Sequence, residues 1–538
     1  MDGSKWIATA ASIWIQCTSG SSYAFGIYSS ALKSSQGYDQ STLDTVSVFK
    51  DIGANVGVLS GLLYSSVAAP RSPSSSLARG PWIVHSAGAI QCFAGYFFLW
   101  ATVTGLIPRP PVPLTCLFMF VAAHAQTFFN TANVVTGVCN FLDYSGTIVG
   151  IMKGFLGLSG PILIQVYKTF LNGKPSTFLL LLALLPTLIS LLLMCLVRVH
   201  QRYMGDEKKH LNGFSAVALI IAAYLLIIII SENIFDFPQW ARMLTFLLLL
   251  LLLSSPLGIT IKAWREDSER SSQTFPTERS GLLDKSESKE SKRLSVAKEE
   301  NGASHDELQD TGEDMNILQA MCTGNFWLLF IAMACGMGSG LATINNITQI
   351  GESLSYTTVE INTLVSLWGI WNFLGRFGAG FVSDILLRQR GWARPSLMAV
   401  TLATMSAGHV LIAAGFPGNL YVGSILVGIC YGSHWSLMPT ITSEIFGVRH
   451  MGTIFNTIAA ASPVGSYILS VRVIGYLYDR EASGSRDSCF GTHCFMLSFF
   501  ILACVCLFGF LVALTLFFRT RSFYRQVVIR RLKHSEKL

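Results

Sequence analysis

The chain has 538 residues, of which 51% are hydrophobic and only 13% are charged, and its mean hydropathy is +0.50. This composition excludes a soluble globular protein and predicts an all-α polytopic membrane protein, because apolar runs of about 20 residues, enough to cross about 30 Å of hydrocarbon, recur along the chain. The formal net charge of +7 is assigned to basic loops that face anionic lipid headgroups, since no basic region outside the membrane suggests nucleic-acid binding.

The apolar runs form three groups in chain order. Residues 1–205 are predicted to form an N-terminal six-helix bundle, with spans at 6–31, 44–69, 81–107, 111–140, 146–171 and 176–199. Residues 206–262 hold a further pair of spans, at 212–235 and 238–262. Residues 317–520 are predicted to form a C-terminal six-helix bundle, with spans at 324–346, 358–384, 394–416, 418–440, 450–478 and 493–518.

The pair at 206–262 is apolar on every face, with runs such as LLIIII and LLLLLLL. It therefore offers little that could line a polar pathway, and we expect a peripheral helix pair. Glu232 and Asp236, near its outer end, are expected to be exposed to solvent. The prediction is about 14 spans; the alternative is 12, with part of the pair lying in the membrane interface.

Basic residues gather on alternate connections between the spans. They are Arg71, Arg79, Arg198, Arg202, Lys208, Lys209, Arg388, Arg390, Arg394 and those of a basic tail at 521–538. By the positive-inside rule these connections face the cytosol. Both termini are therefore expected to be cytosolic, in the plasma membrane or in a vacuolar or other endomembrane.

Residues 263–316 change abruptly to Ser, Glu, Lys and Asp. Such a segment buries too little apolar surface to fold and is predicted to be a disordered cytosolic linker. Within it, Glu278, Leu282 and Leu283 match the acidic dileucine pattern that vesicle-sorting adaptors bind. The match favours an endomembrane destination, although acidic linkers also produce it by chance.

Cysteines are scattered through apolar segments without a CxxC pair. Cys489 and Cys494 differ because they lie beside the sizeable outer loop of the second half, and the sequence leaves a disulfide between them open. No metal-ligand spacing, phosphate-binding loop, nucleophile elbow or paired catalytic carboxylates are found. We therefore expect neither an enzyme nor a cofactor or metal.

A gate is predicted where the span at 358–384 ends, in the pattern Gly380-x-x-x-Asp384-x-x-x-Arg388. Gly380 lets a neighbouring helix approach closely, and Asp384 can pair with arginines where the membrane meets water. The first half carries Ser65 where a repeat would place the acid. The gate is therefore expected to depend on the second half.

The two halves also echo each other, because Gly146-Thr147-Ile148 corresponds to Gly452-Thr453-Ile454. The gate pattern resembles the loop signature of the major facilitator superfamily. The stretches VVTGVCNFLDYSGTIVGIMKGFLGLSGPI, ITQIGESLSY and SEIFGVRHMGTIFN resemble the plant nodulin-like family of that superfamily, which is similar to oxalate/formate and monocarboxylate porters. The resemblance covers nearly the whole chain except the linker. It implies a major facilitator fold and secondary transport of a small solute, without naming the solute.

Ionisable residues inside spans are costly and mark candidate pathway positions. Lys153 lies about 10 Å and Arg376 about 12 Å from the same membrane surface at 1.5 Å per residue. If their helices flank the central cleft, as the resemblance implies, the two cations hold an anion such as a carboxylate. The alternative is that each pairs internally or reaches the interface.

Further polar residues are candidates for the pathway. Asp51 is a candidate proton carrier, and Lys50 beside it is not expected to face the cleft as well, because adjacent helical residues point in different directions. Asn55 and Asn345 offer neutral hydrogen bonds to a solute.

The predicted function is a secondary active transporter of a small solute, with an organic anion or carboxylate as the candidate class, that works by alternating access. The alternative is a membrane receptor or scaffold that has the fold but does not transport. The expected partners are the small-molecule substrate, the lipid bilayer and sorting adaptors that bind the linker.

Overall fold

The computed structural model describes residues 4–67, 80–171, 174–200, 207–274, 314–482, 489–530 and 532. The sorting motif Glu278, Leu282 and Leu283 lies outside the described residues, as do Arg71, Arg79 and Arg202. Every regular element in the described part is helical. The predicted all-α fold is therefore confirmed.

The first half contains the helices that precede the pair of spans predicted at 206–262, which we call the added pair. They are α1 (Lys5–Ser19), α2 (Phe25–Gln36), α3 (Gln40–Asn55), α4 (Val58–Val67), α5 (Trp82–Val103), α6 (Val112–Asn140), α7 (Ser145–Phe170) and α8 (Pro175–Leu193), with short η1 (Ser21–Ala24) joining α1 to α2. The sequence places a single span over α1 and α2 and another over α3 and α4. In the structure each of these two spans consists of two helices with a short break in the α-helix between them.

The second half begins with the short helix α13 (Ile317–Met321). Its longer elements are α14 (Gly324–Ser353), α15 (Thr358–Arg390), α16 (Arg394–Ala414), α17 (Asn419–Ile445) and α21 (His493–Phe523). The span between α17 and α21 is divided into α18 (Met451–Ala459), α19 (Ala461–Ser466), the π-helical η5 (Tyr467–Gly475) and α20 (Tyr476–Ala482).

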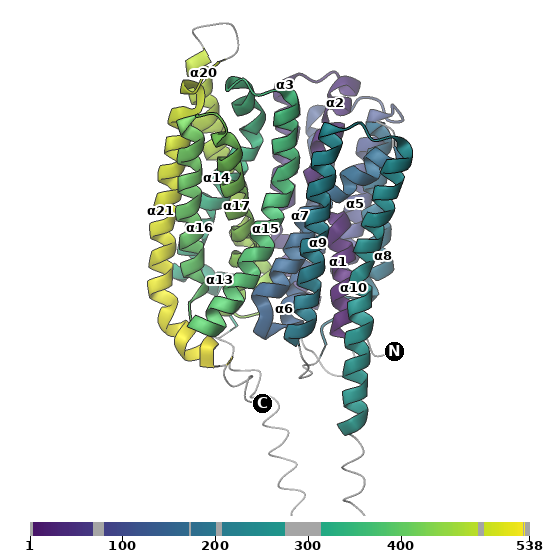
Figure 1. The fold of residues 1–538 in the computed structure, drawn as a ribbon, viewed down its shortest axis with the longest axis vertical. Helices are drawn as coiled ribbons and strands as arrows, with labels where there is room; N and C mark the ends of the chain where they lie inside the picture. Colours follow the sequence, from purple (N-terminus) through teal and green to yellow (C-terminus); the bar gives the residue numbers. More distant parts are fainter. Residues whose placement is uncertain are drawn as a thin grey trace, which may run out of the picture.

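The helices run roughly parallel or antiparallel along one axis (Figure 1). The first helix begins and α21 ends at the same end of the bundle, which we call the terminal face; the opposite end is the far face. Within the described residues, 11 helical segments are long and apolar enough to cross a membrane. The protein is therefore a multi-pass membrane protein.

The added pair consists of α9 (Glu207–Ile234) and α10 (Gln239–Thr274), and both are among these 11 segments. This favours the arrangement with the pair over 12 spans. The expectation that the pair is peripheral is corrected for α9, which packs against α7 of the first half and α15 of the second. The side chain of Glu232 is only 6% exposed, so its predicted exposure is also wrong.

Two predicted boundaries also shift. The segment expected to be a disordered linker from residue 263 begins as helix, because α10 continues to Thr274 and extends past the bundle (Figure 1). The basic tail from residue 521 also begins as helix, because α21 ends at Phe523 and the π-helical η6 (Tyr524–Val528) follows. Charged residues are good helix formers, so composition alone does not end these helices.

The helix α15 carries both Arg376 and Asp384, and particular residues fix where it begins and ends. Thr357 and Glu360 form a capping box at its start, which satisfies backbone N–H groups that have no partner within the helix. It ends at Gly391, whose φ of 64° is the left-handed conformation that glycine adopts without strain. Between them, Gly375 lies against the backbone of Ile429 on α17, where a Cβ atom would meet the carbonyl oxygen.

This close approach predicts opposite effects for two glycines on α15. Gly375→Ala forces α15 and α17 apart and is expected to lower stability by about 1–3 kcal/mol. Gly378→Ala meets nothing within 4 Å and should be neutral or stabilising, because alanine is the better helix former by about 1 kcal/mol. Thermal unfolding in detergent measures both. Equal melting temperatures would contradict the packing.

Candidate functional site

The two halves meet at the terminal face through Asp384 on α15. Its carboxylate accepts hydrogen bonds from the backbone N–H of Gly146 (3.1 Å) and from the backbone N–H and hydroxyl of Thr147 (both 2.6 Å). Gly146 and Thr147 form the first turn of α7. An anion is favoured there because the first N–H groups of a helix have no partner within it. Asp384 therefore caps a helix of the opposite half.

Glycines allow this contact. A Cβ atom on Gly146 would lie 2.6 Å from the carbonyl oxygen of Gly380, and one on Gly380 would meet the carbonyl oxygen of Gly146. The backbones of α7 and α15 therefore touch, as the predicted role of Gly380 requires.

The positive partner of Asp384 is Arg394, at 2.7 Å, and not Arg388. Arg394 also pairs with Glu444 at the end of α17, at 2.8 Å. Glu444 in turn accepts a hydrogen bond from the Tyr524 hydroxyl at 2.8 Å. Sequence reasoning missed Arg394 and Glu444 as a pair, because they are far apart in the chain and only the fold brings them together.

Arg388 makes a separate contact across the halves. It donates to the backbone carbonyl of Asp143 at 3.0 Å, and its guanidinium lies 3.9 Å from the ring centroid of Tyr144. Both residues directly precede α7. Arg388 therefore supports the same junction as Asp384, although the two do not form the pair that the sequence suggested.

The first half repeats this arrangement with weaker chemistry. On α4, a Cβ atom on Gly61 would meet the backbone of Gly452 and Thr453 at the start of α18. Ser65 lies four residues later and is 3.4 Å from the Thr453 hydroxyl. The predicted echo between the halves thus reappears as two matching contacts, one with a carboxylate and one with a hydroxyl.

Between the halves lies a cavity of about 760 Å³. Its lining comes from both halves and includes Lys153 on α7, Arg376 on α15 and Asn456 on α18. It also includes Lys168 and Thr348, which lie near the far-face ends of α7 and α14. The cavity therefore extends from the middle of the bundle toward the far face, while the Asp384 junction closes the terminal face.

Arg376 and Lys153 lie together at the base of this cavity, and each is only 1% exposed. Arg376 donates to the backbone carbonyl of Lys153 at 3.0 Å, to Asn372 Oδ1 at 2.9 Å and to the Tyr23 hydroxyl at 2.9 Å. All three acceptors are neutral. In the part of the chain that the structure describes, neither cation forms an ion pair with a carboxylate.

Trp435 on α17 lies between the two cations. Its ring centroid is 4.9 Å from Lys153 Nζ and 5.5 Å from Arg376 Cζ, distances at which the ring face attracts a cation. Its indole N–H is buried without a hydrogen-bond partner among the described residues. Sequence reasoning missed this residue; its signal was a tryptophan among small residues, Gly432, Ser433 and Ser436, in mid-span.

Lys50 and Asp51 both line the cavity and pair with each other at 3.0 Å. The expectation that only one of them faces the cleft is wrong, because long side chains on neighbouring positions bend toward each other. Asn55 and Asn345 also line the cavity. Asn55 donates to the backbone carbonyl of Asp51 at 2.7 Å, within its own helix.

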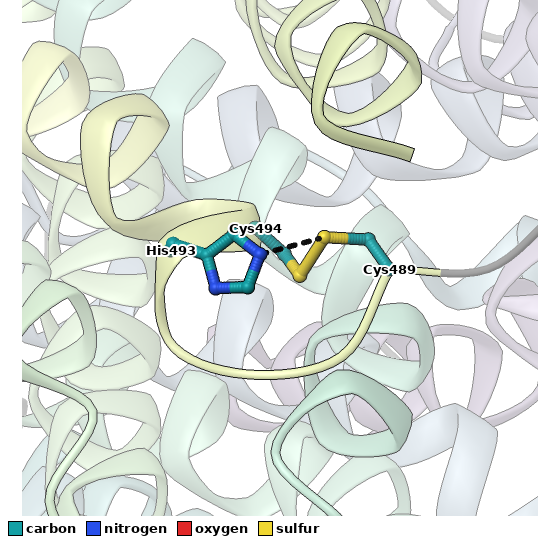
Figure 2. A group of neighbouring side chains, drawn as sticks. All are labelled: Cys489, His493 and Cys494. Carbon is teal, nitrogen blue, oxygen red and sulfur yellow. Dashed lines mark hydrogen bonds between the residues drawn. A yellow bond between two sulfur atoms is a disulfide. The ribbon is translucent and has the colours of Figure 1, made fainter. Parts of the chain in front are cut away.

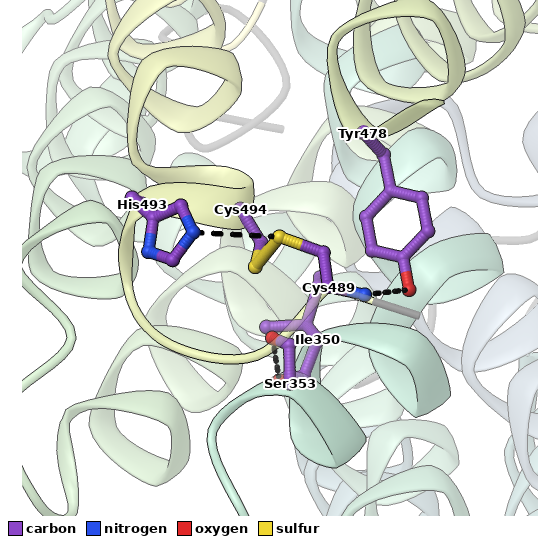
Figure 3. Close-up of a disulfide and its surroundings, with 6 residues drawn as sticks. All are labelled: Ile350, Ser353, Tyr478, Cys489, His493 and Cys494. Atoms are coloured by element: carbon purple, nitrogen blue, oxygen red, sulfur yellow. Dashed lines mark hydrogen bonds between the residues drawn. A yellow bond between two sulfur atoms is a disulfide. The ribbon is translucent and has the colours of Figure 1, made fainter. Parts of the chain in front are cut away.

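A disulfide at the far face joins Cys489, in the loop before α21, to Cys494 in the first turn of α21 (Figure 2). The backbone N–H of Cys489 donates to the Tyr478 hydroxyl at 3.3 Å (Figure 3). The backbone N–H of Gly491 donates to the Ser353 carbonyl at 2.8 Å. His493 Nε2 lies 3.7 Å from Cys489 Sγ. Although these three side chains are close enough to share a metal, both sulfurs are bonded to each other and are not thiolate ligands.

Two family models match the chain. The model described as Nodulin-like matches residues 5–261, and the model described as NFD4, C-terminal domain matches residues 312–526. The protein NUCLEAR FUSION DEFECTIVE 4 of Arabidopsis thaliana is 25% identical over 97% of this chain and 90% of its own length. Probable transporter MCH1 of Yarrowia lipolytica is 27% identical over 35% of this chain and 41% of its own length.

Solved structures give the fold. The proton:xylose symporter XylE of the major facilitator superfamily aligns with a TM-score of 0.54 and 11% identity over 94% of each chain. The human organic anion transporter MFSD10 aligns with a TM-score of 0.50 and 10% identity, over 95% of this chain and 99% of that one. Residues 5–261 therefore match the Nodulin-like family, residues 312–526 match the NFD4 C-terminal domain, and the chain has the fold of the major facilitator superfamily.

Proposed function

We propose that this protein is a secondary active transporter that carries a small organic anion, with carboxylates as the candidate class. One observation carries the proposal: Lys153 and Arg376 lie buried at the base of an interdomain cavity with only neutral or aromatic partners. Burying an unpaired charge is strongly unfavourable. A bound carboxylate offsets this cost at both cations, and arginine can bind it with two hydrogen bonds.

Trp435 extends the proposed site. Its free indole N–H offers a donor beside the two cations, and its ring restricts where they can move. Together, Lys153, Arg376 and Trp435 provide positive charge, directional donors and a flat apolar wall. That combination suits a small planar anion better than a neutral sugar, which would need paired donors and acceptors.

The two ends of the molecule support transport by alternating access. The Asp384 junction closes the terminal face while the cavity lining reaches toward the far face. We assign the terminal face to the cytosol by the positive-inside rule, so this state would receive solute from the opposite compartment. Rocking the halves would break the Asp384 junction and expose the site to the cytosol.

The comparisons support a transporter and leave the solute open. The fungal relatives are described as probable transporters, and the aligned structures include a proton:xylose symporter and an organic anion transporter. Asp51 is our candidate for proton coupling, because its carboxylate lines the cavity and is held by Lys50. Loss of its negative charge on protonation would free Lys50 for an anion.

Removing the Arg376 guanidinium should slow anion uptake strongly. In proteoliposomes screened with labelled acetate, lactate, oxalate and succinate, Arg376→Ala is expected to slow uptake of any accepted solute by about tenfold or more, the effect of losing about 1.5–3 kcal/mol of charged hydrogen bonding. Arg390→Ala is the matched control, because this arginine lies exposed at the end of the same helix. Equal uptake by wild type and Arg376→Ala would remove Arg376 from the site. Binding without uptake in the wild type would favour a receptor.

Changing Asp384 should affect the gate far more than changing its counterpart Ser65. Asp384→Asn removes one of the two buried carboxylates that pair with Arg394. Breaking a buried ion pair costs about 3–5 kcal/mol. Ser65→Ala removes only a 3.4 Å hydroxyl contact. We therefore expect a clear drop in transport rate and melting temperature for Asp384→Asn only. Comparable values in the two variants would contradict the asymmetry.

A further inference from the structure

The added helix α9 occupies the seam between the two halves. It packs against α7 on one side and α15 on the other. Ile229 and Asn233 on α9 are part of the cavity lining. Asn233 donates to the Thr363 hydroxyl of α15 at 3.1 Å. An apparently apolar helix thus presents a polar residue to the cavity at its far-face end.

Glu232, the neighbour of Asn233, binds α7 instead. Its Oε2 atom accepts from Lys168 Nζ at 2.7 Å and from Gln165 Nε2 at 3.0 Å. The Glu232 side chain is 6% exposed whereas that of Lys168 is 36% exposed, and Lys168 lines the cavity. Glu232 Oε1 is buried without a partner among the described residues. The carboxylate is therefore largely buried and lies outside the cavity lining, whereas the Lys168 side chain is partly exposed and lines the cavity.

The pair α9–α10 is anchored to the first half. At the terminal face, the Trp6 indole on α1 donates to Asp267 of α10 at 2.9 Å, and the Thr260 hydroxyl donates to the Trp6 carbonyl at 3.3 Å. The ring of Trp6 also stacks on Phe214 of α9. The Glu232–Lys168 pair holds the other end of α9 to the first half, whereas Asn233 to Thr363 is the single side-chain hydrogen bond from α9 to the second half among the described residues.

We propose that α9 is a wall of the aqueous path, and that Glu232 positions Lys168 at the far-face end of the cavity, where the lysine attracts small anions toward Lys153 and Arg376. The wall follows from the lining alone, whereas the role toward anions rests on the proposed function. Lys168 is compensated by Glu232 and Lys50 by Asp51, so the uncompensated positive charge lies at the base. An anion would therefore pass from a lysine that is paired with Glu232 to two cations that have no carboxylate partner.

Thiol labelling tests the wall without a known substrate. Asn233→Cys, in full-length protein in proteoliposomes, should react with a small anionic methanethiosulfonate, whereas Ile227→Cys on the same helix should not, because Ile227 is 61% exposed on the outer surface of the bundle. The unmodified protein gives the background, since no cysteine is among the residues that line the cavity. If Asn233→Cys reacted with the reagent as slowly as Ile227→Cys, α9 would not be a wall of the aqueous path.

The ratio of anionic to cationic labelling at Asn233→Cys tests the electrostatic role. Lys168→Gln should lower this ratio by roughly fivefold, the size expected for one unit charge several ångström from the thiol in a partly hydrated cavity. Glu232→Gln should raise it, and Lys168→Arg should preserve it. An unchanged ratio in Lys168→Gln would overturn the role of the lysine, even if the wall holds.

The same experiment separates this inference from the proposed transport. Labelling requires only water in the cavity, so Arg376→Ala should lose uptake and still be labelled at Asn233→Cys. A protein that transports nothing but shows the predicted labelling would contradict the proposed function and leave the wall intact. Normal labelling after Lys168→Arg excludes misfolding as the cause of a change in Lys168→Gln.

Discussion

Asp384 places a negative charge inside the protein at the junction of the two halves, which the proposed alternating access would separate. Its carboxylate is stabilised from both sides, by the first turn of α7 in one half and by Arg394 in the other. If the halves part, Asp384 loses its contact with α7. Opening the terminal face would therefore cost the free energy of exposing this carboxylate. In the proposed mechanism, the cavity on the other side of the bundle stays accessible only while this junction holds.

The two halves use the same backbone geometry with different chemistry. Gly61 and Gly380 both bring a helix against the start of a helix in the opposite half, but a carboxylate follows one glycine and Ser65 follows the other. A hydroxyl at 3.4 Å contributes far less than an ion held by several donors. The two halves therefore share the same packing. The larger part of the energy that holds the proposed gate closed comes from Asp384, where the two halves differ.

Much of the fold was predictable because spans are long apolar runs and their hydrophobic signal is local. The meeting of Lys153 with Arg376 was predictable only because the family resemblance places their helices across the cleft, since equal depth alone does not make two residues neighbours. The pairing of Arg394 with Glu444 and the position of Trp435 were not, because they depend on which helices become neighbours. The contribution of α9 was missed for a related reason: Asn233, near one end of an apolar helix, changes its average composition little, and only the packing shows that this residue lines the cavity.

We propose that the Asp384 junction and the cavity lie at opposite ends of one rocking motion. Distances between spin labels in lipid bilayers test it directly, with one pair at the terminal face (Leu196 and Arg390) and one at the far face (Leu106 and Phe416). In Asp384→Asn, we expect a longer terminal-face distance together with a shorter far-face distance than in the protein with Asp384 intact. Distances that stay unchanged, or that change at one face only, would contradict it.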